Sequence, residues 1–138
     1  MNAFPRNMDI TLVIVLLLTI TIIPKAVFCC DSSKEKTVKD LTKAFQAEEW
    51  YNLTFQCSGQ DTVTIHHAGI KQKNKLTEGQ LVSAFGSILT PNVVLKLKGS
   101  GFKKGVLIDG RSRKYPFEIS TRYYTEYQTF LKKLSGEK

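Results

Sequence analysis

Residues 51–67 read YNLTFQCSGQDTVTIHH, and this stretch decides the type of fold. Apolar and polar side chains alternate from Tyr51 to Cys57, and a second alternation runs from Thr62 to His67. Alternation with a period of two is typical of a strand with one buried face, and the Ser58–Asp61 segment, with its glycine, is typical of a turn. The sequence therefore predicts a β-hairpin here.

Helical periodicity is found on both sides of this hairpin. Ser32 and Glu35 form a capping box before a predicted helix over residues 33–49, and Thr77 and Gln80 form another before a helix over residues 77–89. Alternation returns downstream and predicts strands over residues 92–98, 106–108 and 115–119, the last restricted to a sheet edge by Pro116. Helical periodicity over residues 125–134 predicts a short final helix.

The order of these elements predicts an α+β fold. We expect a single curved antiparallel sheet of about five strands, with helices packed on one face. The element order is similar to that of NTF2-like rolls and, less closely, of cystatin-like folds. No diagnostic residue supports either likeness, so the similarity concerns the order of elements only.

An uncharged apolar segment, Ile10 to Ile23, precedes the predicted domain. Arg6 comes before it and Pro24 ends it, which is the layout of a signal peptide. The segment is shorter than the about 20 residues that a membrane-spanning helix needs. The sequence predicts a cleaved signal peptide over residues 1–29 and one secreted domain over residues 30–138. The alternative is an uncleaved anchor formed by residues 10–23, which would make the chain a single-pass membrane protein.

Cysteine usage agrees with secretion. Cleavage after Cys29 leaves Cys30 and Cys57, and an even number of cysteines in an oxidising compartment predicts a disulfide between them. The alternative is that Cys57 is a buried residue with a free thiol.

The triplet Asn52-Leu53-Thr54 is an N-glycosylation sequon, and Asn52 falls on the polar side of its predicted strand, where a glycan fits.

The chain is basic, with a net charge of +8, and +7 without its leader. Such a surplus favours anionic partners, which outside the cell are sulfated glycans, acidic lipid surfaces or acidic proteins; nucleic acid is not expected. Hairpin geometry would gather several cations into one anion-binding patch, and the candidates are Lys96, Lys98, Lys103, Lys104, Arg111, Arg113 and Lys114. The alternative is that this charge only keeps the protein soluble.

No catalytic, metal or cofactor motif is present. The Gly99–Gly105 segment lies between two predicted strands, whereas a phosphate-binding loop needs a helix N-terminus, so a flexible hairpin connection is expected there. His66 and His67 are the only histidines, and neighbours on a strand point to opposite faces, which argues against a shared metal. His67 is the best candidate for a general acid or base; the alternative is a partly buried histidine bonded to a backbone carbonyl.

Together these features predict a secreted, non-catalytic binding protein of unknown ligand. A small apolar ligand would lie between the sheet and the helix over residues 77–89. The first alternative is a basic surface that binds anionic glycans or membranes, and the second is a protein held in the membrane by its signal anchor.

Overall fold

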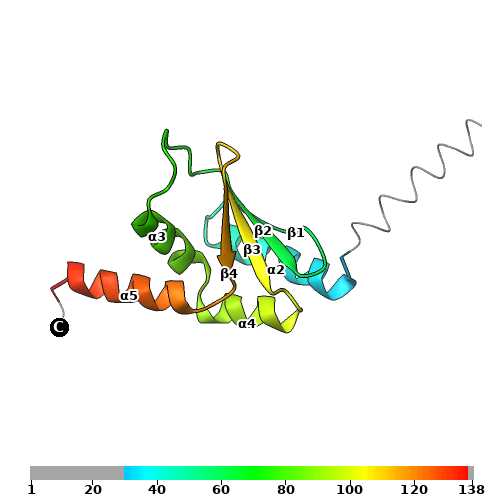
Figure 1. The fold of residues 1–138 in the computed structure, drawn as a ribbon. Coiled ribbons are helices and arrows are strands. Elements are labelled where there is room, and N and C mark those ends of the chain that lie inside the picture. Colours follow the sequence, from blue (N-terminus) through cyan, green and yellow to red (C-terminus); the bar gives the residue numbers. More distant parts are fainter. Residues whose placement is uncertain (1–29, 137–138) are drawn as a thin grey trace, which may run out of the picture.

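The computed structural model describes residues 30–136, which form four helices around a four-stranded sheet (Figure 1). In chain order the elements are α2 (Ser32–Ala47), β1 (Leu53–Cys57), β2 (Thr62–His67), α3 (Glu78–Ile88), α4 (Pro91–Gly99), β3 (Lys104–Asp109), β4 (Lys114–Glu118) and α5 (Arg122–Leu134). The predicted α+β class is confirmed. The predicted leader, residues 1–29, lies outside the described residues.

The sheet is mixed, which corrects the prediction of a purely antiparallel one. Its strand order is β1-β2-β3-β4. The outer pairs β1–β2 and β3–β4 are antiparallel hairpins, whereas β2 and β3 run parallel in the middle, with Ile65 opposite Leu107. Parallel neighbours need a crossover connection, and α3 and α4 supply it.

Residues 92–98 form a helix, so the predicted strand there is wrong and the sheet has four strands instead of about five. Thr90 caps α4 by accepting a hydrogen bond from the backbone N–H of Val93, and Pro91 occupies the first helical position, where its missing N–H costs nothing. Val93, Val94 and Leu97 are buried while Leu95 is 71% exposed, which is a helical pattern of burial. Consequently the Gly99–Gly105 segment joins a helix to a strand and is not a hairpin connection.

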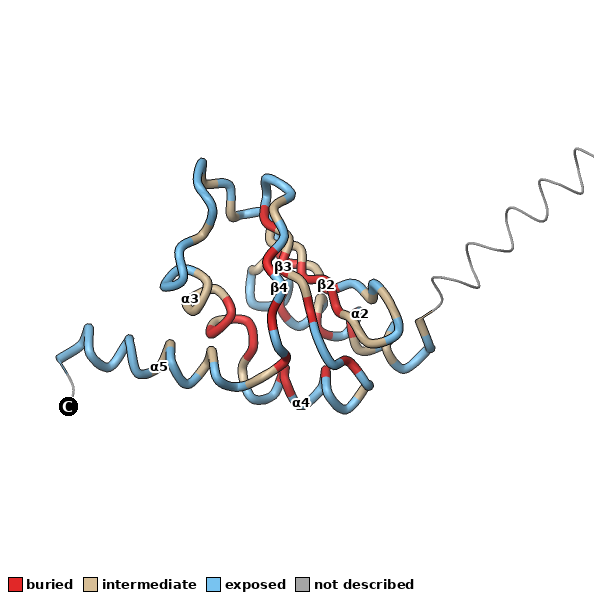
Figure 2. Tube along the Cα trace, viewed as in Figure 1, coloured by how far each residue is buried: buried red, intermediate tan, exposed pale blue. Residues whose placement is uncertain are grey.

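One face of the sheet carries the hydrophobic core. The strand register places alternate residues on this face, among them Phe55, Ile65, Leu107 and Phe117, and all of these are buried. Helices α2, α3 and α4 cover the face with their own buried side chains, and Figure 2 shows this burial concentrated in the middle of the molecule. The sheet therefore presents a covered face, which holds His67, and an opposite face, which holds His66.

Helix α5 extends from the body and contributes no buried residue (Figures 1 and 2). It packs on α3 near Gly86, where a Cβ atom would overlap Tyr127 and lie 2.8 Å from the backbone oxygen of Tyr123. The absence of a side chain at Gly86 thus lets the two helices approach closely. Beyond this contact, Phe130 and Leu134 of α5 are exposed.

Within residues 30–136, no single helix combines the length and apolar content needed to cross a bilayer. Taken together, α3 and α4 meet those two criteria, but they are bent by 74° relative to each other.

Candidate functional site

An open cleft of about 470 Å³ lies between helix α3 and the end of strand β2. Three segments form it: the turn after α2, the chain from His67 to Leu76, and α3, which follows that chain directly. This is the region, between the sheet and the second predicted helix, in which the sequence led us to expect a ligand.

The wall opposite α3 combines apolar side chains with His67, Lys71 and Gln72, and the wall formed by α3 is small or polar. Trp50, Ile70 and Leu76 supply the apolar surface, and they also pack against the hydrophobic core. Helix α3 turns Gln80, Ser83, Ala84 and Ser87 toward the cleft. These residues follow the spacing i, i+3, i+4, i+7, which places them on one face of the helix, and their mostly small side chains leave the space open.

His67 is part of the wall where β2 ends. Its ring lies edge-on to Trp50, with ring centroids 6.2 Å apart, and a Cβ at Gly69 would lie 3.4 Å from its Nδ1 atom. This Nδ1 is buried and has no hydrogen-bond partner among residues 30–136. Burial lowers the pKa of His67 below its usual 6.5, so the ring is neutral at pH 7.

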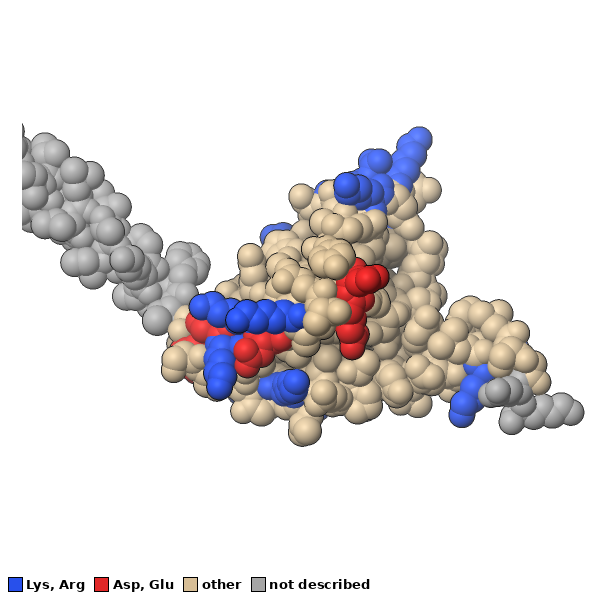
Figure 3. Space-filling model, turned by 180° about the vertical axis from the view of Figure 1, so that it is seen from behind, with Lys and Arg blue, Asp and Glu red and all other residues tan. Residues whose placement is uncertain are grey.

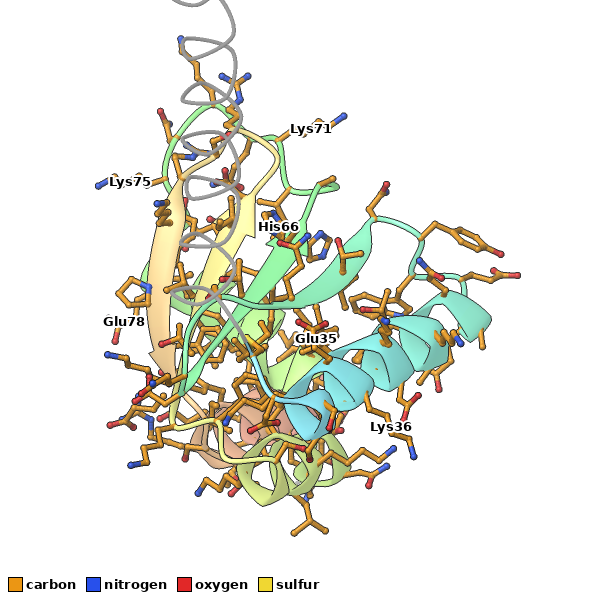
Figure 4. All side chains as sticks on the ribbon, turned by 90° about the vertical axis from the view of Figure 1, so that its right-hand side faces the viewer. Glu35, Lys36, His66, Lys71, Lys75 and Glu78 are labelled. Carbon is orange, nitrogen blue, oxygen red and sulfur yellow. A yellow bond between two sulfur atoms is a disulfide. The ribbon has the colours of Figure 1, made fainter. Side chains whose placement is uncertain are left out.

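The two histidines lie on opposite faces of the sheet, as the strand geometry predicts. His66 lies on the opposite face of the sheet, where its Nε2 atom is 3.0 Å from the side-chain oxygen of Gln56 (Figure 4). Asp109 is opposite His67 in the register of β2 and β3, but its carboxylate is bonded to groups of the β3–β4 turn. Across the described part of the chain, no three His, Cys, Asp or Glu side chains are grouped closely enough to bind a metal.

Asp109 organises the turn between β3 and β4. One carboxylate oxygen accepts hydrogen bonds from the backbone N–H groups of Arg111 and Arg113, both at 2.9 Å. The other accepts from Arg113 Nε at 2.7 Å and from the Tyr115 hydroxyl at 3.1 Å. Burial by itself would raise the pKa of Asp109, but these bonds, above all those from Arg113, outweigh it and hold the pKa below the usual 3.8.

The seven cations expected to form one patch lie at the two ends of the sheet. Lys96 and Lys98 belong to α4, and Lys103 and Lys104 follow it at the start of β3. Arg111 and Arg113 lie in the turn after β3, at the far end of the sheet, and Lys114 is the first residue of β4. Arg111 and Arg113 contact a different basic segment, residues 71–75, which precedes α3.

The predicted Cys30–Cys57 disulfide is confirmed, with the two Cα atoms 6.3 Å apart. It joins the start of the described chain to the end of β1, beside Asp31, which caps α2 by accepting from the Lys34 backbone N–H. A structural disulfide indicates an oxidising, extracellular-type environment. Asn52 is exposed just before β1, and its glycosylation remains a prediction.

Sequence reasoning found His67 and α3 but missed the other cleft residues. Trp50, Ile70 and Leu76 lie in turns and loops, where no periodicity indicates the direction of a side chain. The small and polar stripe of α3, from Gln80 to Ser87, was visible as a helical spacing and is the signal that could have located the cleft.

Searches with this chain match no protein-family model, no curated protein and no solved structure.

Proposed function

We propose that this chain is a secreted, non-catalytic binding protein that holds a small, largely apolar ligand in the cleft between α3 and the end of β2. The observation that carries the proposal is the cleft itself. Its volume of about 470 Å³ falls within the range of roughly 300–1,000 Å³ that is typical of small-molecule sites. The disulfide supports the secretory route, since such bonds persist in oxidising compartments.

The chemistry of the walls supports an apolar ligand that carries one or two polar groups. Trp50, Ile70 and Leu76 would contact the apolar body of the ligand. His67, which is neutral, and Ser83 offer hydrogen-bonding groups that would orient it. A few convergent polar groups in a mostly apolar pocket are the usual basis of ligand specificity. No catalytic role is assigned, because His67 Nδ1 has no hydrogen-bond partner within residues 30–136 and the carboxylate of Asp109 opposite it is bonded to Arg111, Arg113 and Tyr115.

Trp50 makes the proposal directly testable, because it is the only tryptophan in the chain and lies in the cleft wall. The secreted protein would be titrated with N-phenyl-1-naphthylamine, an uncharged apolar fluorophore, while the emission of Trp50 is followed. We expect saturable quenching of Trp50 and sensitised emission from the probe. The variant Ala84→Leu fills the cleft with a good helix former and should weaken binding by at least about tenfold.

The matched control is Ala47→Leu, which adds the same side chain at an exposed position at the end of α2. This variant should bind the probe as the unmodified protein does. Circular dichroism would establish that both variants are folded. If Ala84→Leu binds the probe as tightly as the unmodified protein, or if the emission of Trp50 does not respond to the probe, the cleft is not the binding site.

A further inference from the structure

We propose that the end of the sheet opposite α4 is a binding surface for a sulfated polyanion such as a heparin-like glycan. The surface, called here the cationic tip, is formed by the loop after β2 and the turn between β3 and β4. Its five exposed cations are Lys71, Lys73, Lys75, Arg111 and Lys114. The loop after β2 also borders the cleft proposed above, but Lys71 is the only one of the five cations that lines it, so the two proposals can be tested separately.

The two segments of the tip are joined by four hydrogen bonds to four consecutive carbonyl groups. The backbone N–H of Gly110 donates to the Ile70 oxygen at 2.6 Å, and Arg111 Nε donates to the Lys71 oxygen at 2.8 Å. The guanidinium of Arg113 donates to the next two oxygens, those of Gln72 at 2.6 Å and Lys73 at 3.1 Å. A loop held at every carbonyl over this stretch has a defined backbone, so its lysines are presented in a defined arrangement.

Gly110 is required for this close contact. A Cβ atom at this position would lie 2.6 Å from the backbone oxygen of Ala68 and 2.8 Å from that of Ile70. It would also lie 2.6 Å from Cγ of Lys71, so the aliphatic part of that lysine already rests against the turn. The turn and the loop therefore fit together through backbone and aliphatic atoms, and the charged ends of the side chains are left to solvent.

The charge of the tip is not neutralised internally. The buried carboxylate of Asp109 is paired with Arg113, and residues 68–77 and 110–117 contain no other acidic residue. The ion pairs found within residues 30–136 are Asp31–Lys34, Asp109–Arg113 and Glu118–Arg122, so none includes a cation of the tip. Figure 3 shows one group of basic side chains at this end of the molecule, apart from the mixed basic and acidic side chains lower on the same face, and Figure 4 shows Lys71 and Lys75 extending away from the tip.

The polar character of the tip favours a hydrated polyanion over a membrane. Proteins that lie on membranes commonly insert apolar side chains beside their basic residues. Here the other exposed residues include Asn74, Gly110 and Ser112, and the exposed large hydrophobic side chains of the described chain, such as Leu95 and Leu134, belong to other elements. Four of the five cations are lysines, which act as point charges and suit sulfate groups spaced along a flexible chain.

The test compares two variants that lose the same charge. The tip variant carries Lys73→Gln, Lys75→Gln and Lys114→Gln, and it leaves Lys71 of the cleft intact. The control variant carries Lys36→Gln, Lys39→Gln and Lys43→Gln on exposed positions of α2, away from the tip (Figure 4 labels Lys36). Each would be expressed from the full chain through the secretory pathway, and its affinity for immobilised heparin would be measured at several salt concentrations.

We expect the tip variant to bind heparin at least about tenfold more weakly at physiological ionic strength, because a protein that makes fewer cationic contacts releases fewer counterions when it binds. The slope of log affinity against log salt should become shallower by about 2–3, if each of the three removed contacts contributes roughly the 0.7–0.9 found for nucleic acids. The control variant should stay within about twofold of the unmodified protein. Binding of N-phenyl-1-naphthylamine should be unchanged in both variants, which separates this result from the cleft.

Three outcomes would overturn the proposal. Equal weakening of both variants would show that net charge alone attracts heparin. Equal affinity for heparin and for desulfated heparin would show that sulfate groups are not recognised. Binding to vesicles of phosphatidylserine and phosphatidylcholine without binding to heparin would assign the tip to membranes.

Discussion

Replacing Asp109 with asparagine would remove one negative charge from the base of the β3–β4 turn and keep the size of the side chain. The amide oxygen can still accept from the backbone N–H groups of Arg111 and Arg113. The amide nitrogen, however, would face Arg113 Nε, which is also a donor and lies 2.7 Å from the oxygen that it replaces. The buried ion pair is thereby lost and one guanidinium N–H faces another donor.

The expected loss can be estimated from the surroundings of this pair. Breaking a buried ion pair costs about 3–5 kcal/mol, and a hydrogen bond to a charged group contributes about 1.5–3 kcal/mol. The side chain of Asp109 is 0% exposed, but that of Arg113 is 19% exposed and keeps its bonds to the Gln72 and Lys73 oxygens. We therefore expect the free energy of unfolding to fall by about 2–3 kcal/mol. For a domain of this size that corresponds to a decrease in Tm of about 8–12 °C.

The effect should also depend on pH. Because the folded-state pKa of Asp109 is below its unfolded-state value, its contribution is fully present above the unfolded-state pKa of about 4 and is lost as pH falls through the folded-state pKa. The difference between the unmodified protein and Asp109→Asn should narrow over that acidic range. Urea and thermal unfolding followed by circular dichroism would measure it, with the exposed Asp40→Asn as control. A change below about 0.5 kcal/mol at neutral pH would refute this account of the turn.

Two further predictions concern helix packing and the disulfide. Gly86→Ala should lower the free energy of unfolding by about 1–3 kcal/mol and make α5 more sensitive to proteases, because the added Cβ would overlap Tyr127. Gly79→Ala lies on the same helix, and its added Cβ would have no atom within 4 Å. This control should instead raise the free energy of unfolding by up to about 1 kcal/mol. Equal effects of the two substitutions in chemical unfolding would contradict the close contact of α3 and α5. The double variant Cys30→Ser and Cys57→Ser should lose about 3.5 kcal/mol, since the bond closes a loop with a sequence separation of 27. Urea unfolding with and without reductant measures this loss, and insensitivity of the unmodified protein to reductant would count against it.

The elements predicted correctly are those whose signals are local. The hairpin of β1 and β2, the helix after Thr77 and the Cys30–Cys57 bond follow from periodicity, a capping box and the number of cysteines. The strand predicted at residues 92–98 is wrong because Val93, Leu95 and Leu97 alternate with Val94, Lys96 and Lys98, a pattern that also suits a strand. The Thr90-Pro91 pair was the stronger signal, since a capping threonine followed by proline is typical of a helix start.

The parallel pairing of β2 and β3 and the shape of the cleft depend on contacts between distant segments. A strand at residues 92–98 predicts an antiparallel meander, because it leaves no helix directly before β3 to act as a crossover. The cleft depends on the path that residues 68–76 take as they leave the sheet. Backbone carbonyl groups of this loop accept hydrogen bonds from Gly110, Arg111 and Arg113, which fix that path. Such hydrogen bonds leave no pattern in the sequence of the loop itself.

The parallel contact at the middle of the sheet also bears on the order in which the chain folds. The β1–β2 and β3–β4 hairpins each close over a short turn, whereas β2 meets β3 only after the whole α3–α4 crossover has been placed. Contacts between residues distant in sequence form more slowly than local ones, so joining the two hairpins should be the slow step. Both cysteines of the Cys30–Cys57 bond lie in the N-terminal half of the chain. The disulfide can therefore form before the second hairpin has folded.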